Sequence, residues 1–474
     1  MSVLDNFKRI AAIPRESGHE EGIRAFIVGW AASKGFECVT DKTGNVIIYC
    51  PATKGYENVP EVALQGHMDM VCVKRPGSKH DFRKDPIELV QDGDTLRAKD
   101  TSLGADDGMA IATIMDIFTD PNAKHGKLEA ICTVNEEVGL TGAYGLDASL
   151  IHARKLINID SEEEGVIYVG CAGGSDVKAV FDKPKKPMCS CQEAVSLEIS
   201  GLKSGHSGGE IHLQRANAIK VASRMMHQMG KSHDYSLASF DGGTKRNAIP
   251  AEACVVFTAK KEDVPAIKKE LESYKKAMIS ENRIEEPEMK ITISEVDGQP
   301  SVYSKEDSRA FINSLFMAPH GVLAWSKTIP GIVQTSCNLA IVKTEGNTIT
   351  VETSQRSNVM SQRDAASERM AMILATSGAT TKIGEGYPAW DPDPNSKLAQ
   401  FCAKAWEEEF GKKPVITAIH AGLECGIINS KIPGMDSVSI GPNLKDVHTV
   451  NESCSVSSAE RISDFVKHLL SIIK

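Results

Sequence analysis

Five short stretches of the chain combine histidine or carboxylate side chains with the end of an apolar run or the start of a helix. The first is LQGHMDMV, in which His67 and Asp69 follow the apolar residues 62–64. Residues i and i+2 of a strand point to the same face, so the two side chains could enter one shared space. A strand that simply leaves the core and turns polar explains this stretch equally well, because single motif matches carry a real false-positive risk.

The other four stretches carry the same residue types. They are LGADDGMA with Asp106 and Asp107, CTVNEEVG with Glu136 and Glu137, LINIDSEE with Asp160, and IGPNLKDVHTVNES with His448. Each has a simpler explanation when it is taken alone. An Asp before a helix is commonly an N-cap, and acids or histidines in loops are commonly exposed.

Taken together, the five stretches favour a metal site. Ligands of open α/β sheets bind outside the carboxyl ends of the strands, and His67, residues 136–137 and Asp160 all follow apolar runs that we expect to be strands. If these strands are parallel neighbours, the acids would repel one another and raise their own pKa values unless cations neutralise them. Zinc accepts imidazole and carboxylate ligands, and a carboxylate that bridges two ions about 3.5–4 Å apart recurs in hydrolases. The pattern therefore predicts a two-metal hydrolase.

The segments that position these residues change in character along the chain. In the first ~185 residues, helical periodicity at 2–12 and 20–33 alternates with short apolar runs, which predicts an α/β layer structure. The Pro- and Lys-rich segment 181–191 predicts a boundary. After it, alternating polar and apolar runs predict an α+β domain with largely antiparallel pairing.

A second Pro- and Gly-rich segment, IGEGYPAWDPDPNS, covers residues 383–396. After it, helical and strand patterns alternate again as in the first part of the chain, and the last of them is an amphipathic helix near 456–473. We therefore expect one α/β domain formed by residues 1–186 and 385–474. Residues 187–384 are expected to form an inserted α+β domain.

The composition is that of a soluble globular protein, with 41% hydrophobic and 25% charged residues. The net charge of −9 and the absence of a long basic run argue against nucleic acid and membrane surfaces as partners. No secretory signal or membrane-spanning apolar run is apparent. The 12 cysteines are scattered, and the close pair Cys189 and Cys191 lacks the second pair of a zinc knuckle. We expect a cytoplasmic protein with reduced thiols.

The motifs GHMD, GADDG, NEEVG and NID, followed by a late loop histidine, resemble the M20 metallopeptidases. A narrower match, to the aminoacyl-histidine dipeptidases (carnosinase-like Xaa-His dipeptidases), lies in LQGHMDMVC, TSLGADDG, NEEVGLTGA and SGHSGGEIHLQRANA. The resemblance extends over nearly the whole chain. It implies an α/β catalytic domain of the phosphorylase/hydrolase-like zinc peptidase type, with an inserted α+β lid domain.

The resemblance also implies two zinc ions, which cobalt or manganese could replace. The implied ligands are His67 and Asp160 for one ion, Glu137 and His448 for the other, and Asp106 as the bridge between them. Glu136 would be the general base that acts on a water held by the metals, and Asp69 would orient His67. The Asp106–Asp107 peptide bond would be cis.

Further roles are implied for residues of the inserted domain and the last segment. His206 in SGHSGG would donate to the oxyanion of the tetrahedral intermediate. Arg356 in SQRSN would bind the C-terminal carboxylate of the substrate, because a guanidinium pairs with a carboxylate bidentately, and Asn247 would assist. Glu424 would hold the substrate ammonium, although an ordinary loop acid explains it as well. The lid would close over the substrate and form a homodimer contact.

The expected function is hydrolysis of small Xaa-His dipeptides, including β-alanyl-histidine. A broader M20 dipeptidase, a tripeptide aminopeptidase or a deacylase is the alternative, because the metal site would perform the same hydrolysis in all of them. A non-catalytic scaffold of the same fold is a third interpretation. The presence of all five ligands together with Asp69 and Glu136 argues against it.

Overall fold

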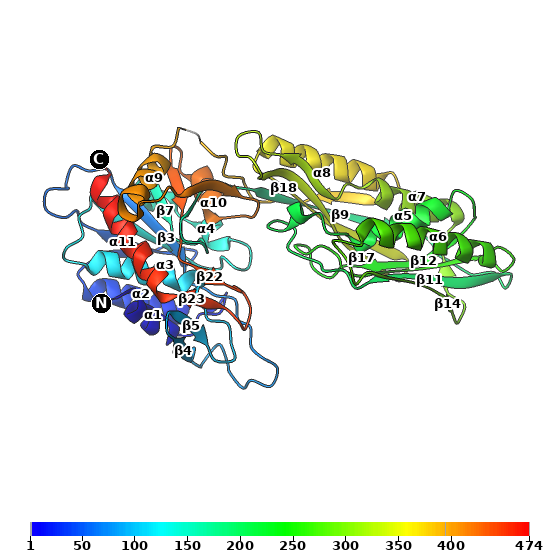
Figure 1. Ribbon diagram of the computed structural model, residues 1–474, viewed down its shortest axis with the longest axis horizontal. Coiled ribbons are helices and arrows are strands. Elements are labelled where there is room, and N and C mark those ends of the chain that lie inside the picture. Colours follow the sequence, from blue (N-terminus) through cyan, green and yellow to red (C-terminus); the bar gives the residue numbers. More distant parts are fainter. Residues whose placement is uncertain (1, 394, 474) are drawn as a thin grey trace. The chain divides into compact units, whose positions relative to one another are not determined.

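The chain folds into two compact units, and both are discontinuous in sequence. A computed structural model describes residues 2–393 and 395–473 (Figure 1). The first unit comprises Met1–Cys171, Trp390–Ala418 and Leu423–Lys474, and the second comprises Ala172–Ala389 and Ile419–Gly422.

The boundaries of the units differ from the expected ones at 186 and 385. Strand β9 (Gly173–Asp182) pairs along its whole length with β18 (Thr348–Ser357) of the second unit. Residues 172–186 therefore belong to the second unit, and the Pro- and Lys-rich segment is a connection inside it. At the other end, residues 385–389 also belong to the second unit. The expected boundaries differ because Pro- and Gly-rich composition indicates where regular secondary structure is interrupted. It does not indicate which sheet a strand joins.

The first unit is built on an eight-stranded mixed sheet. In spatial order its strands are β1 (Glu37–Thr40), β2 (Val46–Cys50), β6 (Leu128–Thr133), β3 (Val62–His67), β7 (Lys155–Asn158), β21 (Asp436–Ser439), β8 (Val166–Cys171) and β20 (Val415–Ile419). The central strands β6, β3, β7 and β21 run parallel to one another. Strands buried on both faces form near-continuous hydrophobic runs, as the fully buried β3 and β6 do. The parallel pairing of neighbouring strands, on which the sequence argument for one shared site depends, is therefore present.

Helices pack on this sheet and supply much of the core. They are α1 (Val3–Ala11), α2 (Glu21–Ser33), α3 (Ala105–Thr119), α4 (Thr141–Gly145), the 3₁₀ turn η1 (Ala148–Leu150), α9 (Lys397–Phe410), α10 (Glu424–Lys431) and α11 (Val456–Ile472). Helix α3 packs on β3, α9 packs on β21, and α11 contacts both helices. A small antiparallel sheet adds β4 (Leu89–Asp92), β5 (Thr95–Ala98), β22 (Leu444–Lys445) and β23 (Ser453–Ser455).

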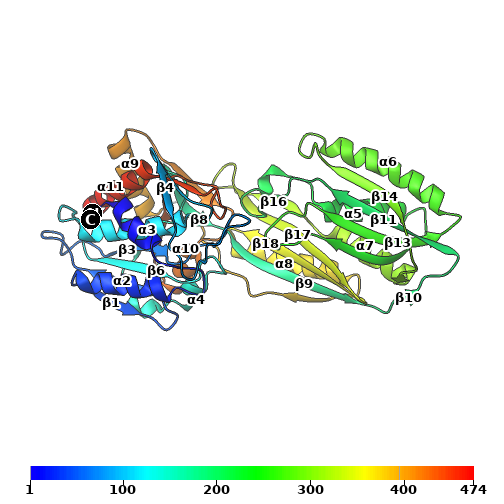
Figure 2. The same ribbon diagram turned by 90° about the horizontal axis from the view of Figure 1, so that it is seen from below.

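The second unit is an antiparallel sheet with helices packed against it, as the sequence predicted. Its further strands are β10 (Lys186–Pro187), β11 (Gln192–Ser200), β12 (Ser236–Gly242), β13 (Ala253–Lys260), β14 (Lys290–Val296), β15 (Ser301–Val302), β16 (Gly321–Trp325), β17 (Val333–Glu345) and β19 (Thr380–Ile383). Figure 2 shows β9, β17 and β18 side by side, as their pairing requires. The helical elements are η2 (Ile211–Leu213), α5 (Ala218–Met229), α6 (Val264–Asn282), α7 (Lys305–Met317) and α8 (Met360–Ala375).

The core of the second unit lies between its main helices and its sheet. Helix α5 packs on β11 and β13, and α8 packs on β9 and β18. The buried side chains between them include Phe181, Phe240, Phe257 and Phe311. In the described part of the chain, no helix is long and apolar enough to span a membrane.

Candidate active site

The carboxyl ends of three adjacent parallel strands carry four of the predicted residues of the first unit. Strand β3 ends at His67, the β6 strand is followed by residues 136–137, and β7 is followed by Asp160. These strands are neighbours in the order β6–β3–β7. Their register aligns His67 with Thr133, the last residue of β6. The sheet therefore brings together side chains that are up to 93 positions apart (160 − 67) at one edge.

Asp106 lies between the two histidines of this cluster. One of its oxygens, Oδ1, is 3.0 Å from His67 Nε2, and the other, Oδ2, is 3.0 Å from His448 Nε2. A second carboxylate lies near the same nitrogen of each histidine. Asp160 Oδ1 lies 3.6 Å from His67 Nε2, and Glu137 Oε1 lies 3.1 Å from His448 Nε2. The Asp106–Asp107 peptide bond, at the start of α3, is cis as the resemblance implied.

The donor atoms of this cluster fit metal ions. Three groups have ligand atoms that lie within 4.8 Å of one another: His67, Asp106 and Asp160; His67, Glu136 and Glu137; and Asp106, Glu137 and His448. Two of the groups share Asp106, so one carboxylate can contribute an oxygen to each of two ions. Imidazole nitrogen and carboxylate oxygen are donors that zinc accepts. The chemistry and the spacing of the donors therefore fit a pair of such ions.

The pKa shifts of the cluster show that its carboxylates favour a nearby positive charge. Burial and the neighbouring acids raise the pKa values of Asp160 and Glu136 well above the ordinary range. Burial would also raise the pKa of Asp106, but hydrogen bonds from His448 and His67 outweigh it and lower that pKa. Hydrogen bonds to Asp106 and Glu137 raise the pKa of His448 to about 11. The histidines thus supply positive charge next to the carboxylates. Bound metal ions would supply this charge directly.

Asp69 contacts the backbone of the cluster as well as His67. Its Oδ1 accepts a hydrogen bond from the Glu136 N–H at 3.0 Å and lies 3.4 Å from His67 Nδ1. Its Oδ2 accepts from Ser17 Oγ at 2.7 Å and from the Glu137 N–H at 3.3 Å. His67 Nδ1 also donates to the Asp69 carbonyl at 3.1 Å, so the ring directs Nε2 at Asp106. Asp69 therefore fixes a histidine and two acidic residues at once.

Two buried residues that the sequence analysis missed hold the backbone around Asp106. The Glu452 carboxylate accepts the N–H groups of Leu103, Gly104 and Ala105 at 2.7–3.0 Å. The Arg15 guanidinium donates to the carbonyl of Gly104, and also to the carbonyls of Met68 and Asp69 at 3.2 and 2.9 Å. Glu452 lies four residues after His448, and an acid this close to a candidate ligand was the only signal that the sequence offered for it.

In the second unit, His206 is half-buried in the glycine-rich segment that the sequence singled out. The Gly209 N–H donates to His206 Nδ1 at 3.0 Å, which places the proton of a neutral ring on Nε2. The Ser207 N–H donates to the Asn247 carbonyl at 2.8 Å, and His206 pairs with Ala248. The structure therefore brings the loop of the exposed Asn247 alongside His206.

Arg356 lies near the end of β18 and is mostly buried, with 9% of its surface exposed. Its Nη1 donates to the Tyr387 hydroxyl at 2.7 Å, while its buried Nε has no hydrogen-bond partner among the described residues. The Tyr387 ring fits between two glycines, since a Cβ added to Gly174 or Gly422 would come within 2.5 or 2.9 Å of it. Sequence reasoning missed Tyr387, which it placed in a Pro- and Gly-rich hinge.

Gly208 connects the histidine and the arginine of this second group. A Cβ at this position would lie 3.1 Å from His206 Cε1, 3.3 Å from Arg356 Cζ and 2.5 Å from the His420 carbonyl oxygen. The three residues therefore crowd around one glycine. The His420 ring is buried and contacts Ser336 Oγ at 2.8 Å, and burial together with the charge of Arg356 lowers its pKa to about 3. It is neutral at physiological pH.

Glu424, the residue expected to hold the substrate ammonium, lies in the interior of the first unit. It is fully buried at the start of α10, where its Oε2 accepts hydrogen bonds from Gln65 Nε2 at 2.5 Å and Thr133 Oγ1 at 2.6 Å. Burial raises its pKa to about 7. Its other oxygen, Oε1, is buried and has no hydrogen-bond partner among the described residues, so binding of the substrate ammonium by Glu424 stays a prediction.

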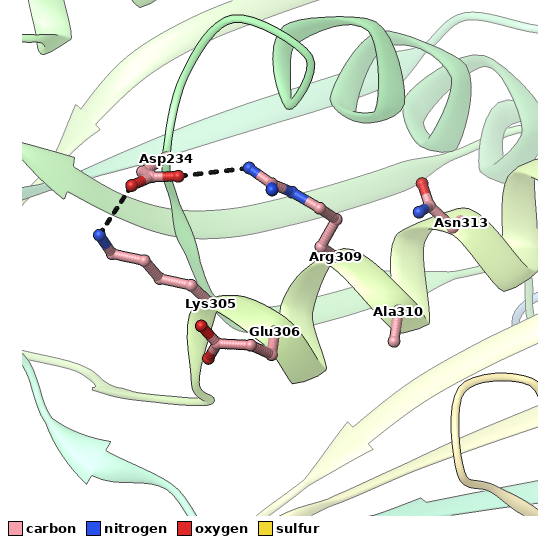
Figure 3. Close-up of a pocket in the computed structure, with 6 residues that line it drawn as sticks. All are labelled: Asp234, Lys305, Glu306, Arg309, Ala310 and Asn313. Carbon is pink, nitrogen blue, oxygen red and sulfur yellow. Dashed lines mark hydrogen bonds and ion pairs between the residues drawn. The ribbon is translucent and has the colours of Figure 1, made fainter.

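A surface pocket lies elsewhere in the second unit (Figure 3) and contains none of the predicted residues. It has a volume of about 450 Å³ and is lined by Asp234, Lys305, Glu306, Arg309, Ala310 and Asn313. Lys305 Nζ lies 2.9 Å from Asp234 and Arg309 Nη2 lies 3.3 Å from it. Because its principal charges already pair with one another, this pocket does not compete with the strand-end cluster as the candidate active site.

Comparison with known proteins agrees with this geometry. Residues 63–472 match the model of Peptidase family M20/M25/M40. The chain belongs to this family. It is therefore a peptidase with an M20 fold. A curated relative, the cytosol non-specific dipeptidase of Escherichia coli (strain K12), is 37% identical over 98% of this chain and 96% of its own length.

Solved structures show the same kinship. The crystal structure of aminoacylhistidine dipeptidase from Vibrio alginolyticus matches with a TM-score of 0.90 and 37% identity, over 100% of this chain and 96% of that chain. An aminopeptidase PepT structure from Bacillus cereus matches with a TM-score of 0.59 at 18% identity, over 99% and 97% of the two chains. The second likeness shows the fold alone.

Proposed function

We propose that this M20 peptidase is a metal-dependent dipeptidase, with two zinc ions per chain and with Xaa-His dipeptides among its substrates. The observation that carries the proposal is the placement of Asp106, with one oxygen facing His67 and the other facing His448. The chain is 37% identical to each of two dipeptidases over nearly its full length, and this similarity supports the substrate class. One relative is named non-specific and the other aminoacylhistidine dipeptidase, so the proposal includes Xaa-His dipeptides without restricting the enzyme to them.

The strand-end cluster would hold the metals. His67 and Asp160 would bind one ion, Glu137 and His448 the other, and Asp106 both. When bound, the ions polarise the peptide carbonyl and make a water molecule more acidic. The protein's contribution is to hold these donors in place through Asp69, Glu452 and Arg15 before any ion arrives.

Glu136 would act as the general base. Its N–H is fixed by Asp69 at 3.0 Å, and its buried carboxyl has a pKa raised well above the ordinary range. A carboxylate in such surroundings takes up a proton readily, which suits a group that accepts the proton of the attacking water and passes it to the leaving amine. Bound cations would lower this pKa again, so the carboxylate would be ionised when the attack begins.

The second unit would recognise the substrate. Arg356 would pair with the C-terminal carboxylate in a bidentate contact, through a neighbouring Nη and through Nε, which has no hydrogen-bond partner among the described residues. His206 would donate its Nε2 proton to the oxyanion of the tetrahedral intermediate, and Asn247 would assist beside it. We assign the second unit the roles of lid and homodimer contact, as the resemblance implies.

The experiment that tests this function is a steady-state panel on the purified protein. Its substrates are Xaa-His dipeptides, other dipeptides, tripeptides and acyl-amino acids, and each is tested before and after chelation. We expect turnover of dipeptides that chelation abolishes and zinc, cobalt or manganese restores. Faster turnover of tripeptides would favour the aminopeptidase alternative, and full activity after verified removal of metal would contradict the two-metal site.

A further inference from the structure

Two exposed cysteines share one turn of the second unit, in a segment that contains no candidate site residue. Cys189 and Cys191 lie between β10 and β11, and both thiols are exposed, whereas the other ten cysteines are buried or half-buried. One thiol on a surface carries no functional meaning by itself. Two thiols on the same turn can form a disulfide with each other if the turn brings their sulfur atoms close together.

Hydrogen bonds on three sides fix the backbone of the turn. The Gln192 N–H donates to the Cys189 carbonyl at 2.9 Å and closes the turn, and the Gln192 side chain accepts from the Cys189 N–H at 3.1 Å. The Lys261 N–H donates to the Cys191 carbonyl at 3.0 Å and ties the turn to the end of β13. The two Sγ atoms on this turn lie 2.6 Å apart, so a sulfur–sulfur bond of ~2.05 Å between them requires only a small further approach.

The two thiols also differ chemically. The Cys191 thiol and the Cys191 N–H, at 3.4 Å, both donate to Cys189 Sγ, and these hydrogen bonds lower the pKa of the Cys189 thiol. The same thiol contact raises the pKa of Cys191. Burial raises the pKa of Cys50, by contrast, to about 12. Since the thiolate is the nucleophile, Cys189 is suited to attack and Cys191 to follow.

We propose that Cys189 and Cys191 form a thiol–disulfide exchange site, which a low-molecular-weight disulfide converts into an intramolecular disulfide. The Cys189 thiolate attacks one sulfur of the small disulfide, forms a mixed disulfide and releases the first small thiolate. The Cys191 sulfur, after losing its proton to that thiolate, attacks Cys189 Sγ and releases the second small thiolate. The dithiol loses two electrons and the small disulfide gains them.

The test uses the full-length metal-loaded protein and glutathione disulfide as the probe, followed by rapid alkylation and peptide mass mapping. The wild-type chain should lose both thiols of the turn, retain no glutathione, and recover both thiols with a reductant. The Cys191→Ser chain should retain one glutathione on Cys189. In the Cys189→Ser chain, the reaction of Cys191 should be at least about tenfold slower.

Cys254→Ser is the matched control, because Cys254 is a half-buried thiol of the same unit whose pKa is raised by burial. It should leave the exchange at the turn unchanged. Persistent glutathione on Cys189 of the wild-type chain overturns the proposal, and so do equal rates for the wild-type and Cys189→Ser chains. The exposed turn should tolerate both serine variants, which unchanged thermal unfolding curves would verify.

Discussion

The two groups of candidate residues are held in opposite ways. In the first unit, the side chains of the cluster contact one another directly, with Asp106 only 3.0 Å from both His67 and His448. In the second unit, His206 is held through a loop N–H and Arg356 through one tyrosine hydroxyl. The first group is a dense set of charges at the ends of parallel strands, and the second is a sparse set on an antiparallel sheet and its glycine-rich loop.

This difference reflects the charge of what each group would bind. Five carboxylates and two histidines near one strand edge leave an excess of negative charge, which calls for cations. The second group instead presents a guanidinium whose buried Nε has no partner in the described part of the chain, which calls for an anion. Damage to the first group should therefore appear in metal content and kcat. Damage to the second should appear in KM and in the dependence on the substrate carboxylate.

Substitution of Asp106 should have the largest effect, because it removes the residue shared by both expected ions. We expect Asp106→Asn to lose bound metal and to lower kcat/KM by about 10⁴-fold or more, since the metals supply several kcal/mol of transition-state stabilisation. Metal analysis and steady-state kinetics measure the two effects. Asp100→Asn, at an exposed acid paired with Arg75, is the control that should change neither. Normal metal content in Asp106→Asn would remove its bridging role.

Glu136→Gln should separate catalysis from metal binding within the same cluster. The amide keeps the size of the side chain but cannot accept the proton, so kcat should fall by about 10²–10⁴-fold while metal content is unchanged. The control is Glu163→Gln, at an exposed acid of the loop after β7. If Glu136→Gln retained more than a tenth of the wild-type kcat, another group would have to be the base.

Arg356→Ala should break the second group alone. Loss of a cation that meets a buried carboxylate costs about 2–5 kcal/mol, so kcat/KM on dipeptides should fall by about 30-fold or more, mainly through KM. Metal content should not change. The control is Arg309→Ala, at the arginine of the pocket in Figure 3, where the partner is Asp234.

Dipeptide amides sharpen this test, because they lack the carboxylate. Wild-type and Arg356→Ala chains should hydrolyse them at similarly low rates. A large effect of Arg356→Ala on the amides would show that the arginine supports the fold of the site and not the substrate carboxylate.

Asp69→Asn tests how far the first group depends on its support. The carboxylate accepts hydrogen bonds from two backbone N–H groups and Ser17, and an asparagine would turn an NH₂ group towards some of these donors. We expect metal affinity to fall by about 10- to 100-fold, which competition with a chelator measures. Full recovery of activity at high metal concentration is expected; no recovery would mean that Asp69 does more than hold the ligands.

Much of the first group could be predicted from the sequence, because a residue at the end of a buried strand is recognised from its immediate neighbours in the chain. A buried parallel strand is a continuous apolar run, and the residue after it is automatically at the sheet edge, so His67, residues 136–137 and Asp160 could be found together. The support of Asp106 could not be predicted. Glu452 is 346 positions away from it, and no local pattern reports a contact of that range.

The second group and α10 were harder to predict for physical reasons. Helix α10 is short and buried, so Glu424 lacked a helical pattern and was interpreted as a loop residue. Composition predicted a hinge where Tyr387 stands, although its ring requires the glycines at 174 and 422 to admit it. Such a fit depends on three distant segments, and only the folded structure reveals it.

Tyr387→Phe should produce the smallest effect and gives the finest test of the contrast between the two groups. The change removes the hydroxyl that accepts from Arg356 Nη1 at 2.7 Å but keeps the ring between its glycines. One hydrogen bond to a charged group contributes about 1.5–3 kcal/mol at most, and the freed guanidinium can still reach a carboxylate, so KM for dipeptides should rise by about 5- to 10-fold with kcat nearly unchanged. The effect should disappear on dipeptide amides and in the Arg356→Ala background, because Tyr387 would act only through the arginine. An equal effect in that background would assign Tyr387 to the packing of the second unit. Arg356 would then bind the substrate carboxylate without being positioned by Tyr387.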